Sequence, residues 1–289
     1  MDRRAFLSAL ALASCTACIS QENELAVGSK NFTEQLILGE ILKQSLESAS
    51  HMPVEGRFYL AGTYICQQAI LAGRIDSYVE YTGTALAAIL KLPRAGDAAA
   101  VLEQVRTEYN RRFHLDVMPR LGFNNSFAMV MRPEDAQRLG VKTLSQLAPV
   151  SPQLRLGVGY EFLERQDGYK GLVRTYDLHF AEAPRVMDLG LLYRALQNRS
   201  VDIVAGNNTD GLIAALGLLV LEDDKHYFPP YDAVPIARPE LFQKCPQAQQ
   251  VFQLLAGRIS ADRMRAMNYA VDGRKQDAAA VAREFLETL

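Results

Sequence analysis

The chain has 289 residues, of which 49% are hydrophobic, and its 31 basic and 33 acidic side chains give a formal net charge of −2. This length exceeds the usual size of a domain with one core, so we expect two lobes. The basic residues form no stripe, which argues against binding to nucleic acid. Trp is absent while Tyr and Phe number 12 each, so aromatic recognition has to come from these two residue types.

The N-terminus has the features of an export signal. Two arginines precede an apolar run over 5–12, which is too short to span a bilayer. The run ends in LASC at 12–15, which resembles a bacterial lipoprotein signal and implies that Cys15 becomes the lipidated first residue. The arginines also resemble a twin-arginine signal, so the export route stays open. We therefore expect a signal peptide at 1–14 and a tether at 15–24, and a place in the periplasm or cell envelope.

Two of the four cysteines lie in the leader region, which leaves Cys66 and Cys245. We expect both to be unpaired, with Cys66 buried on a helix, because a disulfide requires a geometry that sequence does not supply. No second hydrophobic segment reaches membrane-spanning length. The mature chain is therefore expected to meet the membrane only through a lipid anchor.

Strands and helices alternate along the first part of the chain. The apolar segment 25–28 predicts a buried strand, and Asn31 with Glu34 three positions later has the logic of a capping box for the next helix. Asp97 is expected to cap an amphipathic helix over 98–113. Between them we predict strands near 54–59 and at 75–79, and helices over 65–71 and 84–92.

A second alternating series begins at the apolar strand 127–131. It is followed by a strand at 233–237 and a helical remainder with amphipathic segments at 251–255 and 278–285. Within the series we predict strands at 154–158, near 185–187, at 201–204 and 218–221, and helices after Gly168 and over 191–197 and 211–216.

Two such series predict an α/β protein of two lobes joined by two crossing segments. The first lobe would comprise 25–124 and 231–289, and the second 125–230. Such a molecule can close around a ligand by bending at its hinge. A single large sheet is the alternative.

A weak internal sequence repeat indicates that the two predicted lobes are related. Residues 69–82 align without a gap with 195–208, which sets Tyr81 opposite Asn207. Each copy has a helix end, a short break, and an apolar residue plus Asp that opens a strand. The repeat indicates that both lobes present strand ends to a shared cleft.

Common catalytic and metal-binding motifs are missing from the sequence, including GxSxG, HExxH, the P-loop and the EF-hand. The four histidines lack the spacing of metal ligands, and we expect neither a metal nor a cofactor. Asp210 is expected to cap the helix that begins at Gly211. An exported enzyme with Asp210 or Glu80 as a base is the alternative from another class, since fold alone does not decide activity.

Polar and aromatic side chains gather at the predicted strand ends and are candidates for ligand recognition. Aromatic faces attract cations whose charge is spread over methyl groups, and each contact contributes roughly 0.5–2 kcal/mol. A quaternary ammonium has no N–H, so an aromatic cage is a suitable receptor. For each single aromatic, packing is the alternative. The candidates are Lys30, Tyr81, Thr84, Asn125, Phe127, Arg165, Asn207, Asp210 and Tyr231.

Six motifs follow in order over nearly the whole mature chain: SKNFTE at 29–34, EYTGT at 80–84, GFNN at 122–125, RQDG at 165–168, TDG at 209–211 and LEDDKHYFPPYD at 221–232. They resemble those of the substrate-binding proteins of osmoprotectant ABC importers, which bind glycine betaine, choline, carnitine and related quaternary amines. The resemblance implies a periplasmic-binding-protein fold of the two-crossover type (type II).

The resemblance also implies roles for individual residues. Tyr81 and Tyr231 match tyrosines of the family's aromatic cage, and Phe127 stands where the family usually has Tyr. The residues that match those engaging the carboxylate end of the ligand are Lys30, Thr84 and Arg165, whose two cationic side chains suit charge-assisted hydrogen bonds.

Asn207 departs from the family pattern, which commonly has a cage aromatic at this position. Loss of one wall weakens the cation–π attraction and opens space for a bulkier or more hydrogen-bonding ligand. Tyr160 is near enough in sequence to the end of strand 156–158 to compensate, although packing is its expected role.

We therefore expect a monomeric, non-enzymatic receptor that captures a trimethylammonium compound between its lobes and delivers it to an ABC permease with its ATPase. It would be periplasmic or anchored by lipid. A larger betaine such as ergothioneine is the alternative ligand, and a solute sensor that reports to a partner receptor is the alternative role.

Overall fold

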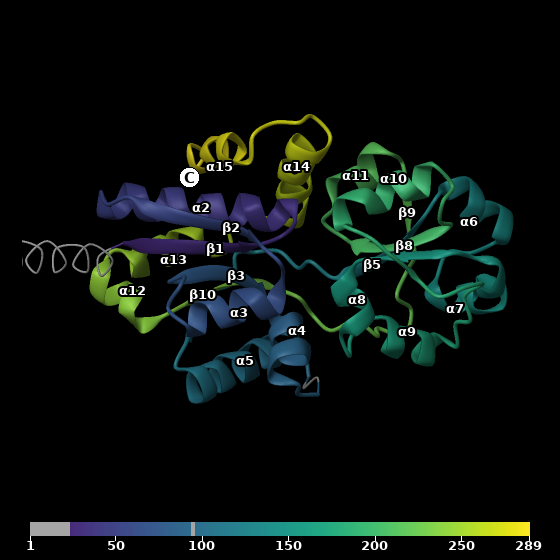
Figure 1. The fold of residues 1–289 in the computed structure, drawn as a ribbon, viewed down its shortest axis with the longest axis horizontal. Helices are drawn as coiled ribbons and strands as arrows, with labels where there is room; N and C mark the ends of the chain where they lie inside the picture. The colour runs from purple at the N-terminus through teal and green to yellow at the C-terminus, as the bar shows by residue number, and fades with distance from the viewer. Residues whose placement is uncertain (1–23, 94–95) are drawn as a thin grey trace, which may run out of the picture.

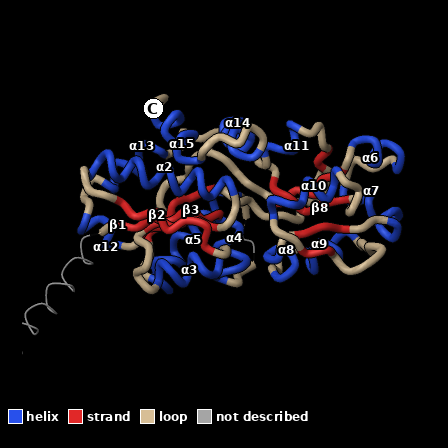
Figure 2. Tube along the Cα trace, turned by 45° about the horizontal axis from the view of Figure 1, so that its top comes forward, coloured by secondary structure: helices blue, strands red, loops and turns tan. Residues whose placement is uncertain are grey.

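The computed structural model describes residues 24–93 and 96–289. The expected signal peptide, the lipidation site at Cys15 and the tether up to residue 23 lie outside the described residues. Two five-stranded sheets, each with helices on both faces, form two lobes side by side (Figures 1 and 2). The prediction of a two-lobed α/β fold is confirmed, and the alternative of a single large sheet is wrong.

The first lobe is built on a sheet with the strand order β2-β1-β3-β10-β4. Its central strand, β3, is parallel to β1 on one side and antiparallel to β10 on the other. The strands are β1 (Leu25–Lys30), β2 (Val54–Leu60), β3 (Ser77–Tyr81), β4 (Asp116–Val117) and β10 (Ala233–Ala237).

Both faces of this sheet are buried, because successive side chains of a strand point to opposite faces. Leu25 and Val27 pack into one apolar cluster, whereas Ala26 between them packs into another with Cys66. Cys66 and Cys245 are both free and Cys66 is buried on a helix, as predicted, and Cys245 is buried as well. In this lobe the first cluster is covered by α2 (Thr33–Ser50), α12 (Pro239–Lys244), α13 (Ala248–Leu255), α14 (Ala261–Asp272) and α15 (Ala278–Leu286). The second is covered by α3 (Thr63–Leu71), a π-helix (Ala85–Leu90) and α5 (Ala98–Phe113), and the short α4 (Thr82–Thr84) links β3 to the π-helix.

The second lobe repeats this arrangement with the strand order β7-β6-β8-β5-β9. The two aligned sequence segments become β3 and β8, and β8 is again central, parallel to β6 and antiparallel to β5. Its strands are β5 (Phe127–Met131), β6 (Leu156–Val158), β7 (Arg185–Val186), β8 (Ile203–Asn207) and β9 (Leu219–Val220). Its helices are α6 (Pro133–Leu139), α7 (Leu144–Leu147), α8 (Tyr160–Glu164), α9 (Tyr169–Tyr176), α10 (Leu192–Gln197) and α11 (Gly211–Ala215), with 3₁₀ turns at Ala148–Gln153 and Leu189–Leu191.

Two chain segments cross between the lobes side by side (Figure 1). Asn124 and Asp232 form an isolated antiparallel bridge, and the Asn125 amide donates to the Tyr231 carbonyl at 3.0 Å. Helix α14, the last but one in the chain, adds a third connection, because the side-chain amide of Asn268 donates to the Thr209 carbonyl of the second lobe at 2.9 Å. Two hydrogen-bonded crossings form a hinge that permits rotation of one lobe against the other.

Two of the three helix caps expected from sequence are wrong. Asp97 accepts hydrogen bonds from the amides of residues 99 and 100 and caps α5 as predicted. By contrast, α2 begins one residue after Phe32, and neither Asn31 nor Glu34 forms a capping box. Asp210 holds the N-cap position of α11, but its side chain makes no capping bond. In both failures the carboxylate accepts from other donors. Glu34 binds four groups that are distant in sequence, and Asp210 binds the Tyr193 hydroxyl and the nearby Asn207 backbone N–H.

Candidate functional site

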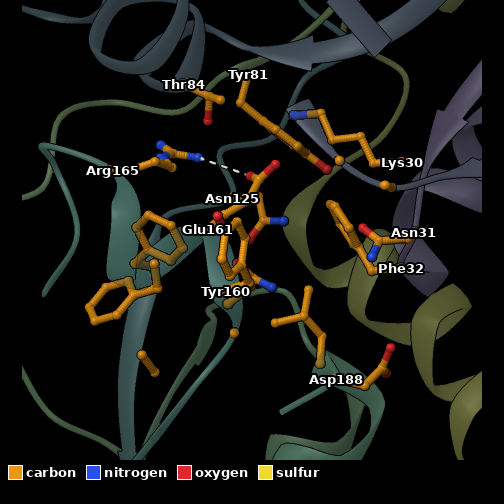
Figure 3. A pocket seen from close by; sticks show the side chains of 18 of the residues that line it. Lys30, Asn31, Phe32, Tyr81, Thr84, Asn125, Tyr160, Glu161, Arg165 and Asp188 are labelled. Atoms are coloured by element: carbon orange, nitrogen blue, oxygen red, sulfur yellow. Dashed lines mark ion pairs between the residues drawn. The ribbon is translucent and has the colours of Figure 1, made fainter. Parts of the chain in front are cut away.

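A cavity of about 330 Å³ lies between the lobes, where the ends of their strands face one another. Carboxyl ends of parallel strands meet at one edge of a sheet, so two opposed sheets bring many strand ends to one place. Figure 3 shows Asn125 and Glu161 in the middle of this cavity, with Arg165 on one side and Lys30 on the other. Eight of the nine candidate residues line it: Lys30, Tyr81, Thr84, Asn125, Phe127, Arg165, Asn207 and Tyr231.

Aromatic rings form two groups on the cavity wall. In the first lobe the rings of Phe32 and Tyr81 are stacked, with centroids 6.4 Å apart. On the opposite side Phe127 meets Tyr231 edge to face at 5.9 Å and Phe162 at 4.9 Å. Tyr81 and Tyr231 therefore belong to one cavity rather than to separate cores. Such an arrangement can receive a cation between aromatic faces.

Glu34 holds the Tyr81 ring of the first aromatic group in place through the Tyr81 hydroxyl, a role that was not predicted from sequence. It is 2% exposed, and its carboxylate accepts four hydrogen bonds of 2.6–3.0 Å. Burial raises the pKa of this carboxyl, and the hydrogen bonds oppose the shift. The donors come from both lobes, the hinge and α14, so Glu34 ties these parts together. They are Tyr81, Asn125, Thr209 and Asn268.

Lys30 stands at the end of β1 and is already paired. Its ammonium lies 2.5 Å from a carboxylate oxygen of Glu80 and donates to the Thr63 hydroxyl at 2.9 Å. Both members of the ion pair are buried, and burial raises the pKa of the Glu80 carboxyl although Lys30 opposes the shift. The ammonium also lies 5.1 Å from the centre of the Tyr81 ring. Glu80, considered from sequence as a catalytic base, is thus the counter-ion of Lys30.

Arg165 repeats this arrangement in the second lobe. Its guanidinium binds Asp167 through two hydrogen bonds, at 2.9 and 2.5 Å, the fork geometry that carboxylates favour. It lies 4.9 Å from the centre of the Phe127 ring and 5.8 Å from that of Tyr231. The Tyr231 hydroxyl donates to Asp167 at 2.6 Å. The cationic side chain thereby holds the aromatic group in place.

Glu161 of α8 connects the two lobes across the cavity. Its carboxylate accepts from the Thr63 amide at 2.6 Å and from the Thr63 hydroxyl at 3.0 Å, at the first turn of α3. One of its oxygens lies 3.9 Å from Arg165. A Cβ at Gly62, whose φ of +151° favours glycine, would overlap this carboxylate. The contact therefore requires both the acid and the bare backbone opposite.

Asp210 is the one candidate that lies outside this cavity. It lines a second cavity of about 130 Å³, which shares the walls formed by Asn207, Phe32 and Leu189. Its carboxylate accepts from the Tyr193 hydroxyl at 2.6 Å and from the Asn207 backbone N–H at 2.9 Å. Burial raises its pKa to about 6. Asp210 thus positions the end of β8.

Tyr160 corrects a further expectation, since its side chain is 68% exposed at the cavity edge and does not pack in a core. Phe32 and Phe162 were missed, although Phe32 lies in a motif singled out from sequence. Within residues 24–93 and 96–289, no group of three or more His, Cys, Asp or Glu is placed to hold a metal ion. No helix in that part of the chain is both long and apolar enough to cross a bilayer.

Comparison with known proteins gives consistent matches. Residues 23–288 match the family described as the substrate binding domain of ABC-type glycine betaine transport system. The carnitine transport binding protein OpuCC of Listeria monocytogenes is 34% identical over 285 residues, covering 97% of this chain and 92% of that one. A solved structure of a glycine betaine/carnitine/choline ABC transporter has a TM-score of 0.75 at 32% identity, covering 91% of this chain and 98% of that one.

A further relative is longer than this chain. The ergothioneine transport permease/ergothioneine binding protein EgtU of Helicobacter pylori (strain G27) is 36% identical over 270 residues. The match covers 93% of this chain but only 48% of that protein.

Proposed function

The chain belongs to the family of substrate-binding domains of ABC-type glycine betaine transport systems, and we propose that it captures a quaternary ammonium compound in the cavity between its lobes. The observation that carries the proposal is the enclosure of one cavity by Tyr81, Phe127 and Tyr231. Their rings attract a methylated cation without needing an N–H donor from it. The cavity volume of about 330 Å³ lies within the range of small-molecule sites.

The hinge links ligand capture to a change of shape that a permease can recognise. Ligand contacts from both lobes stabilise the closed arrangement, and a permease can distinguish the closed receptor from the open one. The receptor works outside the cytoplasm and hands its ligand to a permease driven by an ATPase. Lipidation at Cys15 would keep it near that permease. We put the lobe boundaries at residues 124/125 and 230/231, and the Asn124–Asp232 bridge between the crossing segments supports this choice.

A thermal-shift screen tests the proposal directly. A ligand that binds only the folded protein raises its melting temperature, so choline, glycine betaine, carnitine or ergothioneine is expected to raise Tm by several degrees at concentrations well above Kd. Glycine and glucose serve as controls and are expected to cause no shift. If none of the quaternary amines raises Tm while a control does, the receptor assignment is wrong.

A larger betaine such as ergothioneine is the second candidate ligand, and one observation favours it. Asn207 stands where an aromatic wall is expected, and the second cavity of about 130 Å³ adjoins the first at this residue. A ligand with a ring beyond its trimethylammonium group could extend toward that space and form a hydrogen bond with the side-chain amide of Asn207. A larger Tm shift with ergothioneine than with choline would favour this candidate.

A further inference from the structure

We infer that Glu161 makes this receptor selective for quaternary amines that carry no carboxylate, because the chain supplies its own carboxylate at the cationic end of the cavity. The inference rests on the proposed function and narrows its ligand class to monocations. It therefore counts against the second candidate ligand, because ergothioneine carries a carboxylate. The preferred ligand would be a monocation such as choline, and a zwitterion of the same size, such as glycine betaine, would be disfavoured.

The first support is the position of the Glu161 carboxylate. It accepts hydrogen bonds from the Thr63 backbone amide at 2.6 Å and from the Thr63 hydroxyl at 3.0 Å, which are donors at the start of α3. It also lies 3.9 Å from Arg165. Backbone amides at a helix start and a guanidinium are the groups that a ligand carboxylate would seek. Glu161 already holds them.

The second support is that neither cation at the cavity is free. Lys30 is bound to Glu80 at 2.5 Å, and Arg165 is bound to Asp167 at 2.5 and 2.9 Å. All four side chains of these two pairs are buried. A ligand carboxylate would have to compete with these partners in a low-dielectric setting, where an incompletely paired charge is costly.

The third support is the sum of formal charges around the cavity. The lining residues Lys30 and Arg165 contribute two positive charges and Glu161 contributes one negative charge, while the charge of Asp188, which also lines the cavity, is exposed and screened by salt. The buried partners of the two cations add two further negative charges. The surroundings are therefore net negative, which attracts a trimethylammonium cation and repels a carboxylate placed beside Glu161.

Choline and glycine betaine form a matched pair for the test, because they share the trimethylammonium group and chain length and differ only in a hydroxymethyl or carboxylate end. Calorimetry on the wild-type protein is expected to give at least tenfold tighter binding of choline. In Glu161→Gln the amide oxygen can still accept from the Thr63 amide, but the charge is lost. We expect choline to bind more weakly and glycine betaine more tightly, so that their affinity ratio falls at least tenfold.

Glu164→Gln is the matched control, since it removes the same charge from an exposed position on the same helix. Its affinity ratio is expected to equal that of the wild type, because an exposed charge is screened by salt. The inference is overturned if glycine betaine binds the wild type as tightly as choline, a measurement that needs no variant. It is also overturned if Glu161→Gln leaves the ratio unchanged. Failure of both ligands and of every other quaternary amine to bind would instead refute the proposed function.

Discussion

The ends of β3 and β8 hold equivalent places in the two lobes but offer different chemistry to the cavity. Each strand is central in its sheet, parallel to one neighbour and antiparallel to the other. At the last position of β3 stands Tyr81, whose ring faces the cavity, whereas the last position of β8 is Asn207. The repeated fold therefore supplies two matching positions, and side-chain identity decides which of them is an aromatic wall.

Each of these strand ends is held by a carboxylate from a neighbouring helix start, which is buried in the case of Glu34 and half-buried in the case of Asp210. Glu34 accepts the Tyr81 hydroxyl together with three donors from other parts of the molecule. Asp210 accepts hydrogen bonds from the Asn207 backbone N–H and from the Tyr193 hydroxyl. The first anchor joins the lobes to the hinge and the second stays within its own lobe, so we expect the two to differ in their contribution to stability.

The largest expected effect is that of replacing Glu34. Glu34→Leu removes the acceptor of four buried donors, and we expect it to lower the free energy of unfolding by about 3–5 kcal/mol, because unsatisfied buried polar groups cost about 1–3 kcal/mol each. Asp210→Asn keeps an oxygen acceptor and should cost about 1–2 kcal/mol. Urea unfolding followed by circular dichroism measures both. Equal losses in the two variants would mean that Glu34 is no more than a local anchor.

The pH dependence of stability distinguishes the same two anchors. The pKa of Asp210 is raised from 3.8 to about 6 because burial disfavours its charged form. The folded state therefore binds this proton more tightly than the unfolded state, so its contribution favours folding at low pH and is lost as the pH rises through about 6. Between pH 4 and 7 we expect the wild type to lose up to about 3 kcal/mol relative to Asp210→Asn. A constant difference between the two proteins over this range would show that Asp210 does not titrate there.

Much of the fold follows from local sequence pattern. Strands β5 and β10 and helix α5 have the predicted bounds, because each is a clear apolar or amphipathic run with defined ends. Two caps fail for a physical reason. Glu34 and Asp210 have the right spacing to cap a helix, but donors that are distant in sequence, such as Thr209 and Tyr193, offer them buried hydrogen bonds. No local pattern reveals those partners.

The candidate site divides in the same way. Positions at strand ends could be predicted, since parallel strands present their carboxyl ends at one edge. The ion-pair partner of Lys30 and the contact of Glu161 with Thr63 could not, because they depend on how the chain folds back on itself and how the two lobes meet. Sequence therefore predicted eight of the residues that line the cavity, but not Phe32, Phe162 or Glu161, and not which of the charged side chains are already paired.

A substitution at Tyr81 tests the aromatic wall of the first lobe. Tyr81→Ala removes the ring from the cavity and should weaken binding of a quaternary amine at least tenfold, the loss of one or two cation–π contacts. Tyr81→Phe keeps the ring and loses only the hydroxyl bonded to Glu34, so it should alter stability more than affinity. Calorimetry with the tightest ligand from the screen measures the effect. Unchanged affinity in Tyr81→Ala would refute the cage.

The smallest expected effect comes from making the two strand ends alike. Asn207→Tyr places a ring at the position that matches Tyr81, and we expect choline to bind about threefold to tenfold more tightly, since one cation–π contact contributes roughly 0.5–2 kcal/mol. Asn207→Leu is the control, because it adds apolar bulk without a π face and should not tighten binding. Weaker binding of every quaternary amine by Asn207→Tyr would show that the Asn207 amide makes a needed polar contact. The difference between the two lobes would then be a means of ligand recognition rather than a missing wall.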